Sequence, residues 1–189
     1  MTKVAAITLR KGMVIEINGK LCVIVKNDIM QPGKGASVSQ IEMRDIRTGA
    51  KDNLRFRTQE TLEKVRLEQD EYQYLYPEGE DYVFMNNSNF EQITVKADVI
   101  GDPAVFLQEG MVCEIETYEG EPLNVTLPEK VTLMITEAEP VIKGQTATTS
   151  YKPAVLENGA KVMVPPHVGS GVRIIVRTED GTYIERAKD

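Results

Sequence analysis

The sequence predicts an all-β protein made of three small β-barrels in series. Hydrophobic and polar residues alternate along most of the chain, a pattern typical of strands. A similar hairpin pattern occurs three times, and the charge balance changes between the three thirds of the chain. Modules of about sixty residues bury only about 60% of their unfolded surface, so closure into barrels is the expected way of removing strand edges.

Composition indicates an ordinary folded protein, with 41% hydrophobic and 27% charged residues and no long biased tract. No apolar run approaches the roughly 18 residues of a membrane helix, and Arg10 interrupts any signal-peptide core. We therefore expect a cytoplasmic protein without membrane association. Cys22 and Cys113 lie in apolar alternating segments, which favours buried free thiols over a disulfide or a metal pair.

Each predicted hairpin has two apolar strands around a turn that tolerates positive φ. The predicted turns are Asn18-Gly19, Glu119-Gly120 and Asp180-Gly181. Helix is scarce, and the clearest helical pattern is "DPAVFLQEG", with Asp102 as N-cap, Pro103 at the first helical position and Gly110 just past the end. We expect one short helix packed on a barrel.

Charge divides the chain into unlike thirds. Residues 1–64 hold 12 Lys and Arg against 7 Asp and Glu, residues 65–130 hold 3 against 15, and residues 131–189 hold 7 against 7. We place domains at 1–64, 65–128 and 129–189, from these shifts and from "LPEKV". A basic first module beside an acidic second one suggests that they face different surroundings, the first of them a phosphate backbone.

Two other features have structural interpretations. Tyr72, Tyr74 and Tyr76 alternate onto one strand face and could stack bases, but the acidic middle third favours packing in a barrel. His167 in "VPPHV" lacks the partners of a catalytic triad or a zinc site, so we expect a turn residue.

The stretch "MQPGKGAS" places Lys34 at the tip of a hairpin, between Gly33 and Gly35 and after Pro32. The simplest interpretation is a solvated turn lysine. A nucleotide-binding loop is excluded because Asp28 and Gly35 occupy positions that need Gly and Ser or Thr, and an exposed tip cannot desolvate a Schiff-base lysine. The remaining possibility is an amine presented to another macromolecule or to a modifying enzyme.

Several motifs in order resemble bacterial elongation factor P. They are "PGKG" after "LRKGMVIEINGKLCVIV", "YLYPEGEDYVFM", "YEGEPLNVTLPEKVTLMITEAEP" and "KPAVLENGAKVMVPPHVGSG". The resemblance covers essentially the whole chain. It implies an N-terminal SH3-like (KOW-type) barrel followed by two OB-fold barrels in an elongated, tRNA-like shape.

By this resemblance, the protein is a monomeric translation elongation factor that binds the ribosome between the P and E sites. It is not an enzyme and uses no cofactor or metal. Its tip, with Pro32, Gly33 and Gly35, enters the peptidyl transferase centre beside the CCA end of P-site peptidyl-tRNA and relieves stalling at consecutive prolines. Lys34 is the residue that a lysine-modifying enzyme extends, commonly with a lysyl group.

The resemblance also implies roles for other residues of this sequence, considered one at a time. Arg10, Lys11 and Lys20 meet tRNA phosphates or are ordinary surface charges. Tyr183 and Arg186 in "GTYIERA" match the family's contacts with P-site tRNA near its anticodon stem, although Tyr183 could equally be a core strand residue. The family's C-terminal loop reads Gly-Asp-Thr; here Gly144, Gln145 and Thr146 lose the carboxylate, which puts an E-site mRNA contact in doubt.

Two alternatives to this function stay open at the level of the sequence. One is a general β-barrel RNA-binding or RNA-chaperone protein, and the other is an elongation factor P-like paralogue without the polyproline role. An enzyme acting on a small molecule is a weaker third hypothesis.

Overall fold

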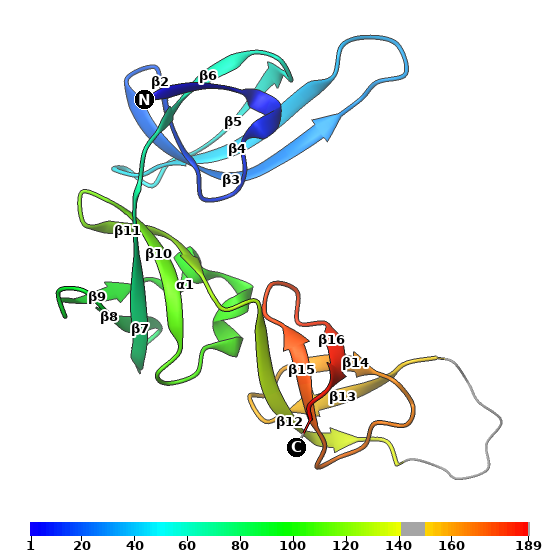
Figure 1. The fold of residues 1–189 in the computed structure, drawn as a ribbon. Coiled ribbons are helices and arrows are strands. Elements are labelled where there is room, and N and C mark those ends of the chain that lie inside the picture. The colour runs from blue at the N-terminus through cyan, green and yellow to red at the C-terminus, as the bar shows by residue number, and fades with distance from the viewer. Residues whose placement is uncertain (141–149, 189) are drawn as a thin grey trace. The chain divides into compact units, whose positions relative to one another are not determined.

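The computed structural model describes residues 1–140 and 150–188, and most of their regular structure is β. The strands form three sheets (Figure 1). Helical structure in these two ranges is limited to η1 (Ala6–Thr8), α1 (Ala97–Ile100) and η2 (Asp102–Phe106). The predicted all-β class is confirmed, and none of the described helices is long and apolar enough to cross a membrane.

The N-terminal sheet has six strands in the order β1-β6-β2-β3-β4-β5. The strands are β1 (Thr2–Ala5), β2 (Val14–Ile17), β3 (Lys20–Met30), β4 (Val38–Asp45), β5 (Lys51–Arg57) and β6 (Thr61–Val65). β2 and β6 pair directly, which places the last strand between the first two.

The other two sheets have five strands each, in the orders β11-β10-β7-β8-β9 and β14-β13-β12-β15-β16. The second sheet contains β7 (Glu68–Glu78), β8 (Asp81–Asn86), β9 (Gln92–Val95), β10 (Val112–Tyr118) and β11 (Glu121–Thr126). The third contains β12 (Lys130–Ala138), β13 (Lys152–Leu156), β14 (Lys161–Val164), β15 (Arg173–Arg177) and β16 (Tyr183–Arg186).

All three predicted hairpins are present. Asn18 and Gly19 have φ values of 51° and 73° between β2 and β3, and Glu119 and Gly120 have 49° and 81° between β10 and β11. Gly181, with φ 70°, lies in the connection between β15 and β16. Positive φ at these positions explains why Asn and Gly are found there.

The chain forms two compact units, residues 1–69 with 116–124 and residues 70–115 with 125–189. In the first unit both faces of the β2–β3 hairpin are buried. Ile15 and Ile24 belong to the core of the N-terminal sheet, whereas Val14 and Val23 pack on the other face with Leu123 of β11. The tip of the second predicted hairpin therefore packs with the first sheet, and the domain boundaries derived from charge remain a prediction.

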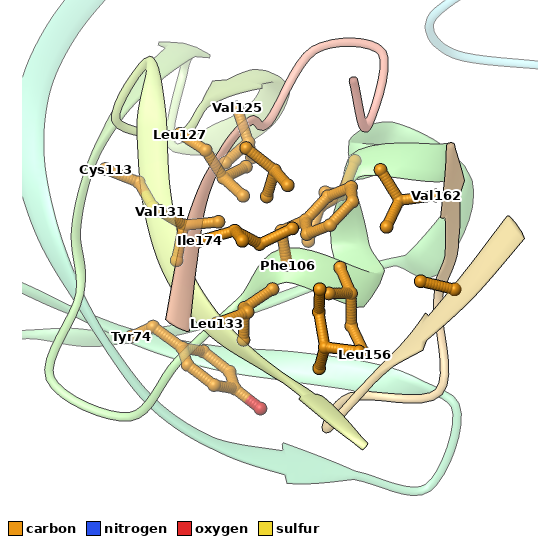
Figure 2. Packing of buried hydrophobic residues seen from close by; sticks show 14 of the residues in the cluster. Tyr74, Phe106, Cys113, Val125, Leu127, Val131, Leu133, Leu156, Val162 and Ile174 are labelled. Carbon is orange, nitrogen blue, oxygen red and sulfur yellow. The ribbon is translucent and has the colours of Figure 1, made fainter. Parts of the chain in front are cut away.

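The core of the second unit takes residues from the second and third sheets (Figure 2). Phe106 lies in this cluster with Leu133 and Ile174. Cys113 is buried here and Cys22 is buried in the first unit, and both are free thiols as predicted.

The short helix predicted between the N-cap Asp102 and Gly110, at residues 103–109, is present only as a shorter helix of another type. The segment is a 3-10 helix that ends at Phe106, and the residue before it is Gly101 with φ 73°. Phe106 is buried, and the chain continues in an extended conformation at Leu107. The short helix α1, which precedes Gly101, was not predicted; a single turn carries too little periodicity to detect.

The shared face predicted for the three tyrosines of β7 is only partly correct. Tyr72 and Tyr74 are buried and contribute to the core, as expected. Tyr76 is 50% exposed, because the β7–β8 register shifts between Tyr74 and Tyr76. The bulge turns the third ring away from the barrel.

The close approach of Gly12 and Asn124 provides a test of how β11 packs on the first sheet. A Cβ atom at Gly12 (φ 90°) would lie 2.7 Å from Asn124 Cγ, whereas a Cβ at Gly19 (φ 73°) would meet nothing within 4 Å. We expect Gly19→Ala to lower the free energy of unfolding by about 1–2 kcal/mol through backbone strain alone. Gly12→Ala should cost about 1–3 kcal/mol more, because it adds a steric clash.

Urea unfolding of both single variants and of the double variant Gly12→Ala/Asn124→Ala separates the cost of backbone strain from the cost of the steric clash. Removing the Asn124 side chain should recover most of the additional loss. Equal losses for Gly12→Ala and Gly19→Ala would show that β11 does not pack closely at this point.

Candidate functional site

The candidate site is the tip of the hairpin formed by β3 and β4, which we call the finger (residues 26–42). Its strands stay paired to the end, with Met30 opposite Val38, and residues 31–37 form the loop between them. Figure 1 shows the loop of this hairpin projecting beyond the strands of its sheet, and β5 pairs with β4 as far as Val38. Ile24 is buried in the core, whereas Ile29 and Met30 are 48% and 39% exposed, so the strand leaves the core on its way to the tip.

Lys34 occupies the tip of the finger, as predicted. Residues 31–36 are all exposed, and Lys34 makes no hydrogen bond or ion pair with any other residue that the structure describes. Gly35 has φ 131°, a value that favours glycine, while a Cβ at Gly33 would meet nothing within 4 Å. Of the two glycines, only Gly35 is required by its backbone conformation in this state. The amine is available to a partner outside the chain.

The three predicted phosphate contacts do not gather at the tip. Lys20 begins β3, at the opposite end of that strand from Met30, roughly 30 Å away along an extended strand. Lys11 is exposed in the turn before β2. Arg10 is exposed, and its Nη1 atom donates hydrogen bonds to the carbonyls of Ile7 (3.0 Å) and Leu9 (3.2 Å). Its guanidinium therefore also supports its own backbone.

Sequence reasoning missed two arginines beside the finger. Arg57 and Arg55 on β5 pair with Val38 and Gln40 on β4, so the four side chains share one sheet face. Both arginines are exposed, and β5 is an edge strand. The alternation in "KDNLRFR" could have revealed this basic row, because it places charges on one face and Leu54 and Phe56 on the other.

The C-terminal candidates are only partly described. Tyr183 is half-buried, and its ring contacts Tyr151 edge-to-face at 6.4 Å between centroids. Burial and Tyr151 raise the pKa of the Tyr183 hydroxyl, so it remains neutral at physiological pH. Arg186 is exposed at the end of β16, opposite Ile174. Gly144, Gln145 and Thr146 lie outside the described residues.

No catalytic or metal constellation is found in residues 1–140 and 150–188. No group of three His, Cys, Asp or Glu side chains is arranged to hold a metal there. His167 is exposed in a turn, as predicted. Burial raises the pKa of the Cys113 thiol to about 12, and burial followed by the charge of Asp45 raises that of Cys22. Neither thiol is an activated nucleophile.

The sequence comparisons agree with the fold. Family models match three successive segments: "Elongation factor P (EF-P) KOW-like domain" at residues 5–62, "Elongation factor P (EF-P) OB domain" at 67–125, and "Elongation factor P, C-terminal" at 131–186. A KOW-like domain ahead of an OB domain, with a cationic finger on the first sheet, defines a multidomain β-type translation factor.

The similar proteins narrow this class to one family. Elongation factor P of Rhodospirillum centenum is 58% identical over 99% of this chain and 100% of its own length, and that of Methylorubrum populi is 52% identical over the same shares. A solved structure of eukaryotic translation initiation factor 5A from Methanococcus jannaschii has a TM-score of 0.42 at 21% identity, covering 67% of this chain and 92% of that one. The chain belongs to the elongation factor P family and is a translation elongation factor.

Burial of Cys113 predicts a specific dependence of stability on pH. The unfolded thiol ionises near pH 9, and the folded thiol only near pH 12, so the unfolded state loses its proton first as pH rises. We expect the stability advantage of wild type over Cys113→Ala to shrink by about 1 kcal/mol between pH 8 and pH 10. Urea unfolding of both proteins at each pH measures this difference. A constant gap would contradict a neutral buried thiol.

Proposed function

We propose that this factor binds the ribosome between the P and E sites and stimulates peptide bond formation at consecutive prolines. In this proposal Lys34 contacts the CCA end of P-site peptidyl-tRNA in the peptidyl transferase centre. The observation that carries the proposal is the exposed Lys34 amine, which has no partner among the described residues and lies in the loop at the end of the paired strands β3 and β4. A cation placed in this way suits a phosphate-rich partner.

Positioning is sufficient for the proposed effect. Proline reacts slowly because the imino nucleophile and the constrained nascent chain seldom reach reactive geometry, so a factor that holds the reactants in place accelerates the step. A tenfold gain needs about 1.4 kcal/mol, which one or two charge-assisted hydrogen bonds to tRNA can supply. The protein then acts as a positioning factor and not as an enzyme.

Further contacts follow from the charge of the first unit. We assign Lys11, Lys20 and the free part of the Arg10 guanidinium to tRNA or ribosomal phosphates, with the basic row of β5 as an additional surface. Tyr183 and Arg186 are proposed to contact P-site tRNA near its anticodon stem. The factor would work as a cytoplasmic monomer whose Lys34 is extended by a lysine-modifying enzyme.

Replacement of Lys34 tests the proposal directly. We expect Lys34→Ala to abolish the rescue of a polyproline reporter while leaving a matched reporter without proline runs unchanged. Lys34→Arg retains a cation but removes the amine that a modifying enzyme would use, so it should recover only part of the activity. Ribosome profiling of the same strains measures stalling across the proteome. A defect spread evenly over all codons would favour a general RNA-binding role instead.

The mass of the native protein tests the modification. The unmodified chain has a mass of 21.1 kDa. We expect protein purified from its own host to be heavier by one added group, and peptide fragmentation to place that group on Lys34. Lys34→Arg protein from the same host serves as the control and should show the unmodified mass. An unmodified Lys34 in fully active native protein would remove this part of the proposal.

A further inference from the structure

Asn27 occupies an unusual position at the root of the finger. It follows the point where the β3–β4 register shifts, between Ile24 and Lys26. Its side-chain amide nitrogen, Nδ2, donates two hydrogen bonds, to the carbonyl of Ala6 at 2.9 Å and to that of Leu9 at 3.1 Å. One side chain therefore joins the root of the finger to the first residue of the 3-10 segment η1 and to the residue after it.

The segment that Asn27 binds is itself held firmly. Ala6 and Leu9 are fully buried in the core. The amides of Ala6 and Ile7 donate to the carbonyls of Glu60 (2.8 Å) and Thr58 (3.1 Å), in the connection between β5 and β6. The acceptors of Asn27 thus belong to a fixed platform and not to a mobile loop.

The other strand of the finger is tied to the same platform. The amide of Thr58 donates to the carbonyl of Ser37 at 3.1 Å, and Ser37 is the last residue of the tip loop before β4. A continuous path of hydrogen bonds runs from Ser37 through Thr58 to Ile7, and the η1 backbone then leads to Asn27. The same platform therefore holds β3 at Asn27, near the root of the finger, and the chain before β4 at Ser37, where the loop ends.

The Asn27 side chain lies on the same sheet face as Ser39. Asn27 pairs with Ile41 and Ile29 pairs with Ser39, so Asn27 and Ser39 are diagonal neighbours on that face. Neither Asn27 Oδ1 nor the Ser39 hydroxyl has a hydrogen-bond partner among the described residues, although both atoms are buried. The two bonds donated by Nδ2 are therefore the hydrogen bonds that hold the Asn27 amide in place.

We propose that Asn27 is a positioning residue that sets the direction of the finger and therefore the location of the Lys34 amine. Two experiments test this inference. The measurement of activity rests on the proposed function, whereas the measurement of the direction of the finger does not. Met30 lies three residues beyond Asn27 along an extended strand, so the tip stands at least about 10 Å beyond the hydrogen bonds of Asn27. A tilt of about 6° at the root would move the tip by about 1 Å, a displacement that can cost on the order of 100-fold in a positioning reaction.

The structural experiment measures the direction of the finger in the full chain. Spin labels are attached to Lys3→Cys and Lys34→Cys, two exposed sites in the same unit, while Cys22 and Cys113 remain buried and unlabelled. We expect Asn27→Ala and Asn27→Asp to broaden or shift the distance distribution, since neither can donate to Ala6 and Leu9. Ser39→Ala removes an unpaired hydroxyl from the same face and should leave the distribution unchanged.

A stability control separates direction from folding. Ile41→Val trims a fully buried residue paired with Asn27 without removing a hydrogen-bond donor. The variants are compared at temperatures equally far below their own melting temperatures. A spin-label distance distribution that broadens or shifts in the Asn27 variants but not in Ile41→Val supports the inference. An unchanged distribution in the Asn27 variants, or equal broadening in Ile41→Val, overturns it.

The activity experiment uses the chain with its native Lys34. We expect Asn27→Ala to lower the rate of peptide bond formation at proline by about tenfold at saturating factor, with the factor concentration for half-maximal effect unchanged. A change in the half-maximal concentration alone would contradict positioning. If Lys34→Ala has no proline-specific defect, the proposed function fails, whereas the distance measurement still decides the role of Asn27.

Discussion

The central constraint on this structure is that the β3–β4 hairpin must hold a charged loop away from its own barrel. An isolated hairpin is at best marginally stable in water, so the loop depends on the sheet behind it. β4 pairs with β3 on one side and with β5 on the other as far as Val38, so the strands are supported up to the point where the loop begins. At the root of the finger Asn27 is hydrogen-bonded to the η1 segment, and at the end of the loop Ser37 is hydrogen-bonded to Thr58.

The rest of the first unit can be understood as support for that root. β3 is buried on both faces where it runs through the sheet, with Ile24 on the inner side and Val23 against Leu123 on the outer side. A strand packed on two sides cannot rotate about its axis without opening one of the two contacts. The β10–β11 hairpin tip therefore contributes to the rigidity of the strand that continues into the finger, although it lies far away in sequence.

Much of the fold could be predicted from the sequence, because strand alternation and turn chemistry are local signals. Asn18-Gly19 and Glu119-Gly120 carry the positive φ values that their residue types favour. Tyr76 could not be placed correctly, because a β-bulge depends on the partner strand and leaves no period-two trace. The packing of Leu123 on β2 and β3 could not be predicted either, because it joins segments about a hundred residues apart in the chain and local patterns carry no information about such contacts.

The candidate site also has features that the sequence predicts and features that it does not. Lys34 was recognisable because Pro32 and the two glycines define a tip in a single short stretch, whereas the ties that hold it depend on tertiary structure. Asn27 looked like an ordinary polar strand residue, since its two acceptors lie 21 and 18 residues away in the chain. Arg10 was selected from the family resemblance and from its place in the basic first module, and its hydrogen bonds to Ile7 and Leu9 give it a structural role that the sequence did not reveal.

The contrast between root and tip explains why a glycine-flanked lysine suits a positioning role. A rigid root fixes where the amine is delivered, while Gly33 and Gly35 leave the last few bonds free to adapt to the partner's surface. If the loop were as rigid as the root, any small mismatch with a partner would cost contacts. If the root were as free as the loop, ordering it would consume binding energy available for holding that partner. Precision therefore resides in the strands and adaptability in the tip, and a covalent extension of Lys34 would lengthen the reach without changing either.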